Sequence, residues 1–259
     1  MITQYIEPIS QLIDLQHKIS HLHPLLVKTF PIGIAQADQL LLYDPDPSGE
    51  LYHFSKEAAL PMPIPEGVRA AFPLESLNNR IACVVTGEVF DTLDGFVTIF
   101  HVFIHCQQFE TCEAKLKEKL GIARKARAAQ NFMWELDHPF PYQTPEFSSL
   151  YQSFLDQSNL KDLDEVIYLH KQLKVILHSE DYEFLLWEEW KEGLARWIEN
   201  KIRQNLSLLE NHNGQERPFS RVSFYEVGAR FIERLELSEP GISFDIENLF
   251  QRMLLQDEY

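Results

Sequence analysis

Residues 81–90 read IACVVTGEVF, and residues 96–120 read FVTIFHVFIHCQQFETCEAKLKEKL. The first segment is rich in β-branched side chains, which predicts a strand. The second carries apolar residues at helical spacing and predicts one long helix. Asp91, Thr92 and Asp94 lie between the two segments and offer capping side chains for the start of that helix. This strand followed by a long helix decides the predicted fold.

The flanking sequence predicts further helices and a few short strands. Residues 2–28 have apolar positions at helical spacing, and residues 30–54 read as short strands around a turn at 44–49. Prolines interrupt residues 58–67, which predicts a loop. The remaining helices are expected at 146–156, 162–179, 182–209, 222–236 and 245–256. We therefore predict an α+β fold, mainly helical, with a small mixed sheet.

Composition narrows the class of protein. The chain has 259 residues, 45% of them hydrophobic, and a formal charge of −16. That charge argues against a nucleic-acid or anionic-membrane partner, because binding to phosphates needs a basic surface. No apolar stretch is long enough for a membrane span, and no secretory signal is visible. Three cysteines without a CxxC motif suggest neither a disulfide framework nor a thiolate zinc site, so we expect a cytoplasmic protein.

Two segments carry the candidate chemistry. His101 and His105 lie four residues apart in the predicted helix, so both imidazoles can reach one metal ion. The second segment, residues 190–199, reads WKEGLARWIE. The HxxxH spacing alone is weak, since ten histidines give roughly 0.4 such pairs by chance. His17 and His21 share the spacing but have no preceding strand and no partner segment, so we interpret them as a surface pair.

Together these segments resemble the zinc metallopeptidases that carry HExxH on a helix and a glutamate ligand downstream, the gluzincin type. The segment KEGLARWIE is similar to their third-ligand helix, an EGxA pattern followed by an aromatic residue and an acid. Residues 224–231, FYEVGARF, resemble the next helix, in which a tyrosine packs near the site. The resemblance implies a zincin-like domain over residues 76–259, with residues 1–75 in the same globule. It implies zinc as cofactor, His101, His105 and Glu192 as ligands, and Tyr225 near the site.

The sequence departs from this family at two places. Val102 stands where the family carries its general base. The interval from His105 to Glu192 is longer than in compact members, which an inserted helical segment would explain. Zinc binding needs only ligands and their supporting contacts, so Val102 leaves the ligand set intact. What Val102 removes is the proton acceptor that hydrolysis needs.

Plainer structural interpretations of the same residues stay open. The two histidines could be core side chains, and Glu192 could pair with Arg196 on a solvated helix face. Gly193 lies in a helix interior, where glycine costs about 1 kcal/mol relative to alanine, so it indicates close packing against a neighbour. Tyr225 could be a core aromatic residue. Glu110 and Glu113 are reserve ligands on the histidine helix, whereas His170 and His178 lie in another apolar helix and are interpreted as packing or surface residues.

Three functions follow from these observations. The first is a metallopeptidase-like protein, inactive or weakly active, that binds a peptide or protein. The second is an active zinc hydrolase whose base comes from elsewhere, for example Glu189 or Glu110. The third is a metal-free structural or interaction protein. In the resembled fold an edge strand binds an extended peptide, so we expect residues 69–79 and the strand at 81–90 to border a cleft.

Overall fold

The computed structural model describes residues 2–156 and 163–254. The chain divides into two compact units. Unit 1 comprises Met1–Glu110 and Ile198–Glu210, and unit 2 comprises Thr111–Trp197 and Asn211–Tyr259. Helix α8 (Ser179–Asn205) contributes residues to both units. Among the described residues, no helix has the length and apolar character needed to cross a bilayer.

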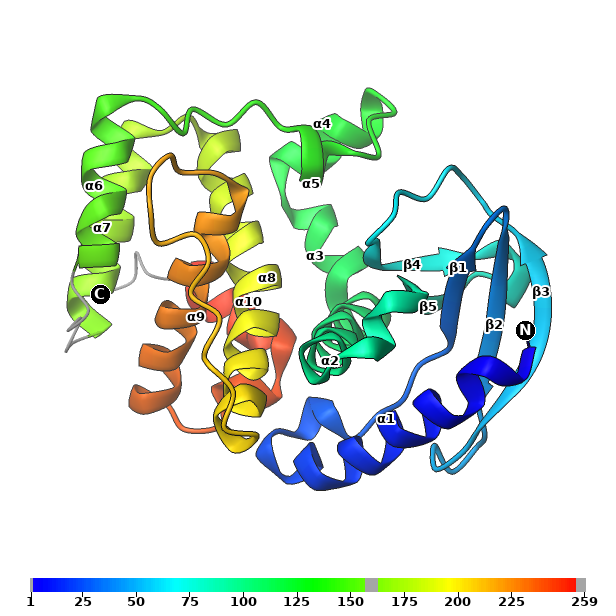
Figure 1. The fold of residues 1–259 in the computed structure, drawn as a ribbon. Coiled ribbons are helices and arrows are strands. Elements are labelled where there is room, and N and C mark those ends of the chain that lie inside the picture. The colour runs from blue at the N-terminus through cyan, green and yellow to red at the C-terminus, as the bar shows by residue number, and fades with distance from the viewer. Residues whose placement is uncertain (1, 157–162, 255–259) are drawn as a thin grey trace. The chain divides into compact units, whose positions relative to one another are not determined.

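Unit 1 is built on a five-stranded mixed sheet (Figure 1). Its strands are β1 (Ile32–Gln36), β2 (Gln39–Pro45), β3 (Tyr52–Ala59), β4 (Arg69–Leu74) and β5 (Arg80–Thr86). The spatial order is β3-β2-β1-β5-β4, with β1 and β5 parallel and the other neighbours antiparallel. The predicted small mixed sheet and the strand within residues 81–90 are confirmed. That strand ends at Thr86, because Gly87–Asp91 forms a short 3-10 helix that leads into the next helix.

Strand β4 lies at one edge of this sheet and has only β5 as a strand partner among the described residues. Strand β5 is internal and pairs with both β1 and β4, so the strand predicted within residues 81–90 does not offer the free edge that peptide addition needs. Pro73, within β4, fits an edge position, because proline cannot donate a ladder hydrogen bond. The boundary expected between residues 75 and 76 falls between these two paired strands, and the domain assignment itself stays a prediction.

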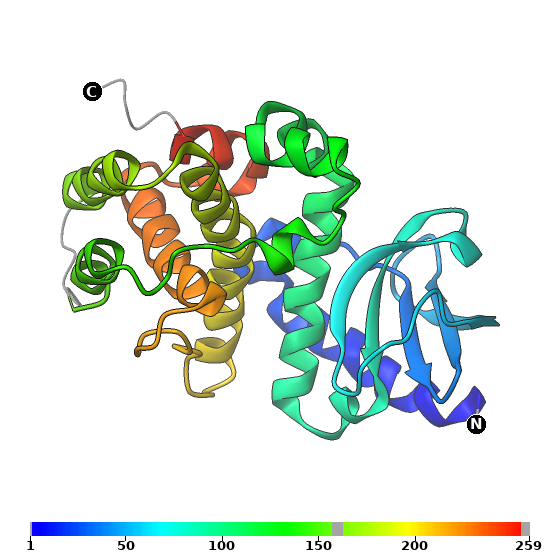
Figure 2. The same ribbon diagram turned by 90° about the horizontal axis from the view of Figure 1, so that it is seen from above.

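Helix α2 (Leu93–Gln108) packs against β4 and β5, and Figures 1 and 2 show it beside the sheet. Its capped start is confirmed, since Thr92 Oγ1 accepts a hydrogen bond from the Gly95 backbone N–H at 3.1 Å. Gly95 is required there, because a Cβ atom would lie 1.9 Å from the Val89 carbonyl oxygen. On the sheet side, the rings of Phe30 and Phe103 pack with centroids 5.6 Å apart. Apolar side chains thus fix which face of α2 is turned to the core of unit 1.

The helix predicted over residues 96–120 is present to Lys119 but is not α-helical throughout. A π-helical turn (Phe109–Glu113) follows α2, and α3 (Ala114–Lys119) follows that turn. A π turn adds a residue to the helical repeat and shifts the face that later side chains occupy. Periodicity alone therefore predicted the presence of helix here but not its π-helical turn.

Unit 2 is helical throughout its regular structure. Besides α3 and most of α8, its helices are α4 (Gly121–Ala128), α5 (Trp134–Asp137), α6 (Pro145–Asp156), α7 (Leu163–Ile176), α9 (Arg221–Ser238) and α10 (Ile246–Leu254). Helices α6 to α10 confirm the sequence prediction within a few residues, and the predicted positions 162, 255 and 256 lie outside the described residues. The short α4 and α5 were not predicted. The core holds many aromatic rings, among them Phe147, Tyr151 and Phe224, with ring centroids 4.8–6.4 Å apart. The α+β, mainly helical class is therefore confirmed.

Candidate metal centre

The two histidines of the HxxxH motif lie on one face of α2. His101 and His105 occupy consecutive turns, and their ring centroids are 4.9 Å apart. The side chain of His101 is 13% exposed, so it is mostly buried but within reach of solvent. Neither ring is a fully buried core side chain, and the helical spacing has placed both imidazoles side by side.

Hydrogen bonds orient both rings in the same way. His101 Nδ1 lies 2.9 Å from Glu199 Oε2, and His105 Nδ1 lies 2.9 Å from Gln108 Oε1. With Nδ1 engaged, a ligand role falls to Nε2 in each ring. Metal-binding histidines in proteins usually have a carboxylate or carbonyl partner on the second nitrogen, which fixes the tautomer and raises ligand basicity.

Glu199 is itself held in place within unit 1. Arg203 Nε donates to Glu199 Oε1 at 2.8 Å, and Arg203 Nη1 donates to Asp94 at 2.7 Å. A chain of charge-assisted contacts thus links the start of α2 to the carboxylate that orients His101. The sequence had shown Glu199 only as the acid at the end of the EGxA-type segment, and its contact with His101 could not be read from spacing.

Val102 lies in the interior of unit 1 and is 1% exposed. It follows His101 directly but occupies a different face of α2, among apolar residues. No proton-accepting group is therefore supplied at this position. The two carboxylates considered as substitute bases are engaged elsewhere: Glu110 pairs with Lys28, and fully buried Glu189 accepts a hydrogen bond from Tyr151 at 2.9 Å.

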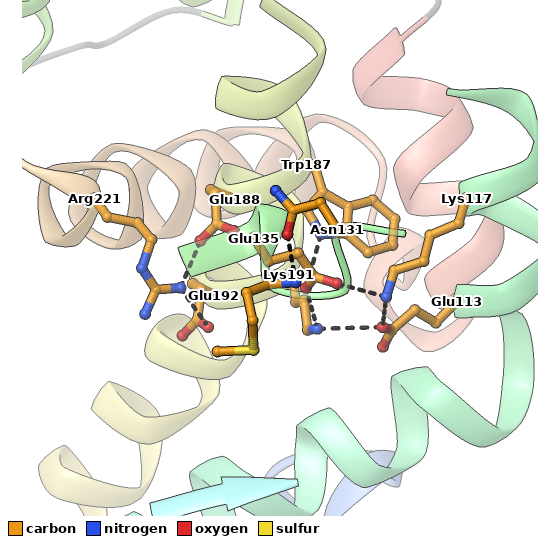
Figure 3. Close-up of polar contacts among 10 residues, drawn as sticks. Glu113, Lys117, Asn131, Glu135, Trp187, Glu188, Lys191, Glu192 and Arg221 are labelled. Carbon is orange, nitrogen blue, oxygen red and sulfur yellow. Dashed lines mark hydrogen bonds and ion pairs between the residues drawn. The ribbon is translucent and has the colours of Figure 1, made fainter. Parts of the chain in front are cut away.

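Glu192 lies on α8, and its carboxylate belongs to a cluster of charges in unit 2 (Figure 3). Arg221 Nη1 lies 3.5 Å from Glu192 Oε1 and donates a hydrogen bond to Glu188 Oε2 at 2.9 Å. Burial raises the pKa of Glu188 to about 8, although the neighbouring Arg221 opposes the shift. The Glu192 side chain is 12% exposed, so it is not on the solvated face that the structural alternative required.

A second set of charges flanks the same turn of α8. Lys191 Nζ donates to Glu135 Oε2 at 2.6 Å and to Glu113 Oε1 at 3.3 Å, and Trp187 Nε1 donates to Glu135 at 3.2 Å (Figure 3). Burial disfavours the ionised form of Glu135, but Lys191 and Lys117 outweigh it and lower its pKa to about 2. The reserve ligand Glu113 is thus committed to this network.

Tyr225 lies on α9, one helical turn after Arg221. The guanidinium groups of Arg221 and Arg196 lie 5.3 and 5.6 Å from its ring centroid. Burial, reinforced by the charge of Glu192, raises the pKa of the Tyr225 hydroxyl, so the group stays protonated at neutral pH. Tyr225 therefore supports the packing of both arginines, and its role at the site stays a prediction.

Close packing explains Gly193. A Cβ atom at Gly193 would lie 2.6 Å from the backbone carbon of Gly228, and one at Gly228 would lie 2.1 Å from the Glu189 carbonyl oxygen. Helices α8 and α9 therefore cross in backbone contact within unit 2. The sequence had indicated a close neighbour for Gly193, and that neighbour is the helix carrying Tyr225.

The three predicted ligands come together. Ligand atoms of His101, His105 and Glu192 lie within 4.8 Å of one another, and the group could hold a metal ion. The continuity of α8 agrees with this grouping, since Glu192 precedes Glu199 by two helical turns on one face, and Glu199 contacts His101. Ligands of a tetrahedral zinc ion lie about 3–4 Å apart, because each is about 2.0–2.1 Å from the ion. Two imidazoles and one carboxylate are a donor set that suits zinc.

Other histidines play different parts. His17 and His21 are exposed and remain a surface pair. His170 is fully buried in unit 2, 3.2 Å from Glu189, and burial lowers its pKa to about 3. The three cysteines are buried, and burial raises the pKa of the Cys83 and Cys106 thiols well above the usual range.

Comparisons with protein families, with curated proteins and with solved structures found no match to this chain.

Proposed function

We propose that this protein is a metallopeptidase-like zinc protein of the gluzincin type that binds a peptide or protein and hydrolyses it slowly or not at all. His101, His105 and Glu192 would hold the metal. The observation that carries this proposal is the grouping of their ligand atoms within 4.8 Å. The Nδ1 contact of His101 with Glu199 supports it, because that arrangement is typical of histidine ligands.

Each ligand has a distinct task in this scheme. The imidazoles would present Nε2, and Glu192 would supply the negative charge that favours a divalent cation. When bound, zinc supplies Lewis acidity and a water of lowered pKa. The chain would still lack the proton acceptor next to His101, since Val102 can neither take nor deliver a proton. Loss of such a base lowers rates by about 10²- to 10⁴-fold.

The edge strand β4 supports the proposed binding activity. An extended peptide can add to an exposed sheet edge through main-chain hydrogen bonds, and β4 packs on α2, the helix that carries both histidines. A partner of this kind suits a chain with a formal charge of −16, which disfavours nucleic acid.

Metal stoichiometry tests the proposal. Protein purified without chelator and exposed to zinc should retain about one zinc ion per chain by mass spectrometry, as expected for a single three-ligand site. His105→Ala and Glu192→Gln should each lose it. The matched control is the double variant His17→Ala with His21→Ala, which removes an exposed pair of the same spacing and should keep the metal. Wild-type protein without zinc, or equal loss in the control, would contradict the proposal.

A further inference from the structure

Arg221 is shared unequally between two carboxylates of α8. Its Nη1 donates a hydrogen bond to Glu188 at 2.9 Å and stays 3.5 Å from Glu192 (Figure 3). Glu188 and Glu192 lie one helical turn apart, so a single guanidinium reaches both. Glu192, the proposed metal ligand, has the weaker of these two contacts.

The position of Arg221 is fixed from several sides. It is the first residue of α9, whose start is set by a reciprocal capping box between Ser220 and Ser223. The ring of Tyr225 lies under the guanidinium at 5.3 Å. Glu188 is fully buried, so the bond that it accepts from Arg221 is poorly screened by solvent.

A guanidinium and a metal ion compete for the charge of one carboxylate. A full hydrogen bond from Arg221 to Glu192 would occupy lone pairs and neutralise charge that the metal needs. Glu188 prevents this by accepting the close hydrogen bond. Its second oxygen, Oε1, is buried without a hydrogen-bond partner, so the bond from Arg221 is made through Oε2 alone.

We propose that Glu188 and Arg221 are positioning residues that set the metal affinity of Glu192, with Glu188 holding the guanidinium off the ligand carboxylate. This inference rests on the proposed function. Its structural part, the partition of Arg221 between two carboxylates, concerns unit 2 alone.

Two substitutions and their combination test the inference. Zinc affinity is measured for every variant by competition with a chromophoric chelator at one pH, 8.5. Glu188→Gln should weaken zinc binding by about 10- to 100-fold, the usual effect of losing a supporting contact. Adding Arg221→Gln to that variant should restore most of the affinity, because the competing cation is gone. If Glu188→Gln acted only by damaging the structure, the double variant would bind zinc more weakly still.

Two single variants and a crystal structure complete the test. Arg221→Gln alone should bind zinc at least as tightly as wild type, and Glu239→Gln, which breaks a remote Arg–Glu pair with Arg252, should change nothing. Crystal structures of metal-free Glu188→Gln should show Arg221 at hydrogen-bond distance from Glu192. A double variant no tighter than Glu188→Gln would overturn the inference.

The crystal structure of Glu188→Gln distinguishes a failure of this inference from a failure of the proposed function. If wild-type protein binds no zinc, the metal site is refuted, and the crystal structure then decides the partition of Arg221. Arg221 remaining at 3.5 Å or more from Glu192 in Glu188→Gln would overturn that partition as well.

Discussion

Replacing Gly228 with alanine sets two physical effects of opposite sign against each other. Intrinsic helix propensity favours alanine over glycine by about 1 kcal/mol in a helix interior. In this structure, however, the new Cβ would lie 2.1 Å from the Glu189 carbonyl oxygen and 2.7 Å from its carbon. Both partners are backbone, so no side chain can rotate away.

The steric cost should exceed the gain in helix propensity. Carbon atoms pack favourably at about 3.5–4.0 Å, so α8 and α9 would have to separate by about 1 Å along their crossing. Overpacking of this kind typically costs about 1–3 kcal/mol, and a backbone contact belongs at the upper end. After the propensity gain, we expect Gly228→Ala to lower the free energy of unfolding by about 2 kcal/mol. At roughly 2–4 °C per kcal/mol for a chain of this size, the midpoint should fall by about 4–8 °C.

Thermal unfolding followed by circular dichroism measures this shift. Gly33→Ala is the control, since a Cβ there meets only side-chain atoms at 3.4–3.5 Å, an ordinary contact distance. Its midpoint should move far less. A Gly228→Ala variant as stable as wild type, or stabilised by the amount that propensity alone predicts, would refute a backbone crossing of α8 and α9.

Three further outcomes are expected. Glu199→Gln removes the carboxylate that orients His101 and should weaken zinc binding by about 10- to 100-fold in a competition titration; unchanged affinity would deny it that role. Val102→Glu restores a proton acceptor and should raise hydrolysis of a fluorogenic peptide by about 10²- to 10⁴-fold. It should also lower the stability of the protein, because the position is buried. No gain in the activity of folded, zinc-loaded protein would show that more than the base is missing. Burial raises the pKa of Glu189, raises that of Glu188 to about 8 and lowers that of His170 to about 3. As pH rises above 6.5, these buried carboxyls hold protons that the unfolded chain has released, so stability should fall in urea titrations by up to about 1.4 kcal/mol per pH unit for each carboxyl. Glu189→Gln should reduce that slope, and an unchanged slope would contradict the raised pKa of Glu189.

Local sequence signals predicted much of the fold. The β-branched run before α2 predicted a strand. Thr92 marked the start of the helix because its side chain can cap an exposed N–H. The interior glycine of α8 indicated a close neighbour before any neighbour was known. Each of these signals acts over a few residues, so it is visible in a single sequence.

Tertiary contacts account for what the sequence did not predict. The π turn at Phe109–Glu113 disturbs no apolar pattern strongly enough to be read from spacing. The contacts of Glu199 with His101 and of Arg221 with Glu188 join residues far apart in the chain, and their residue types are common on any helix surface. The candidate ligands could be selected by motif, whereas the residues that support them could not.

X-ray absorption spectroscopy of the zinc-loaded protein tests the central claim most directly, because it reports the ligand atoms around the metal. The account predicts a shell of nitrogen and oxygen at about 2.0–2.2 Å with the multiple scattering of two imidazoles, and a lower coordination by oxygen in Glu192→Gln. Sulfur ligands at about 2.3 Å, or a spectrum without imidazole scattering, would contradict a metal centre built from His101, His105 and Glu192.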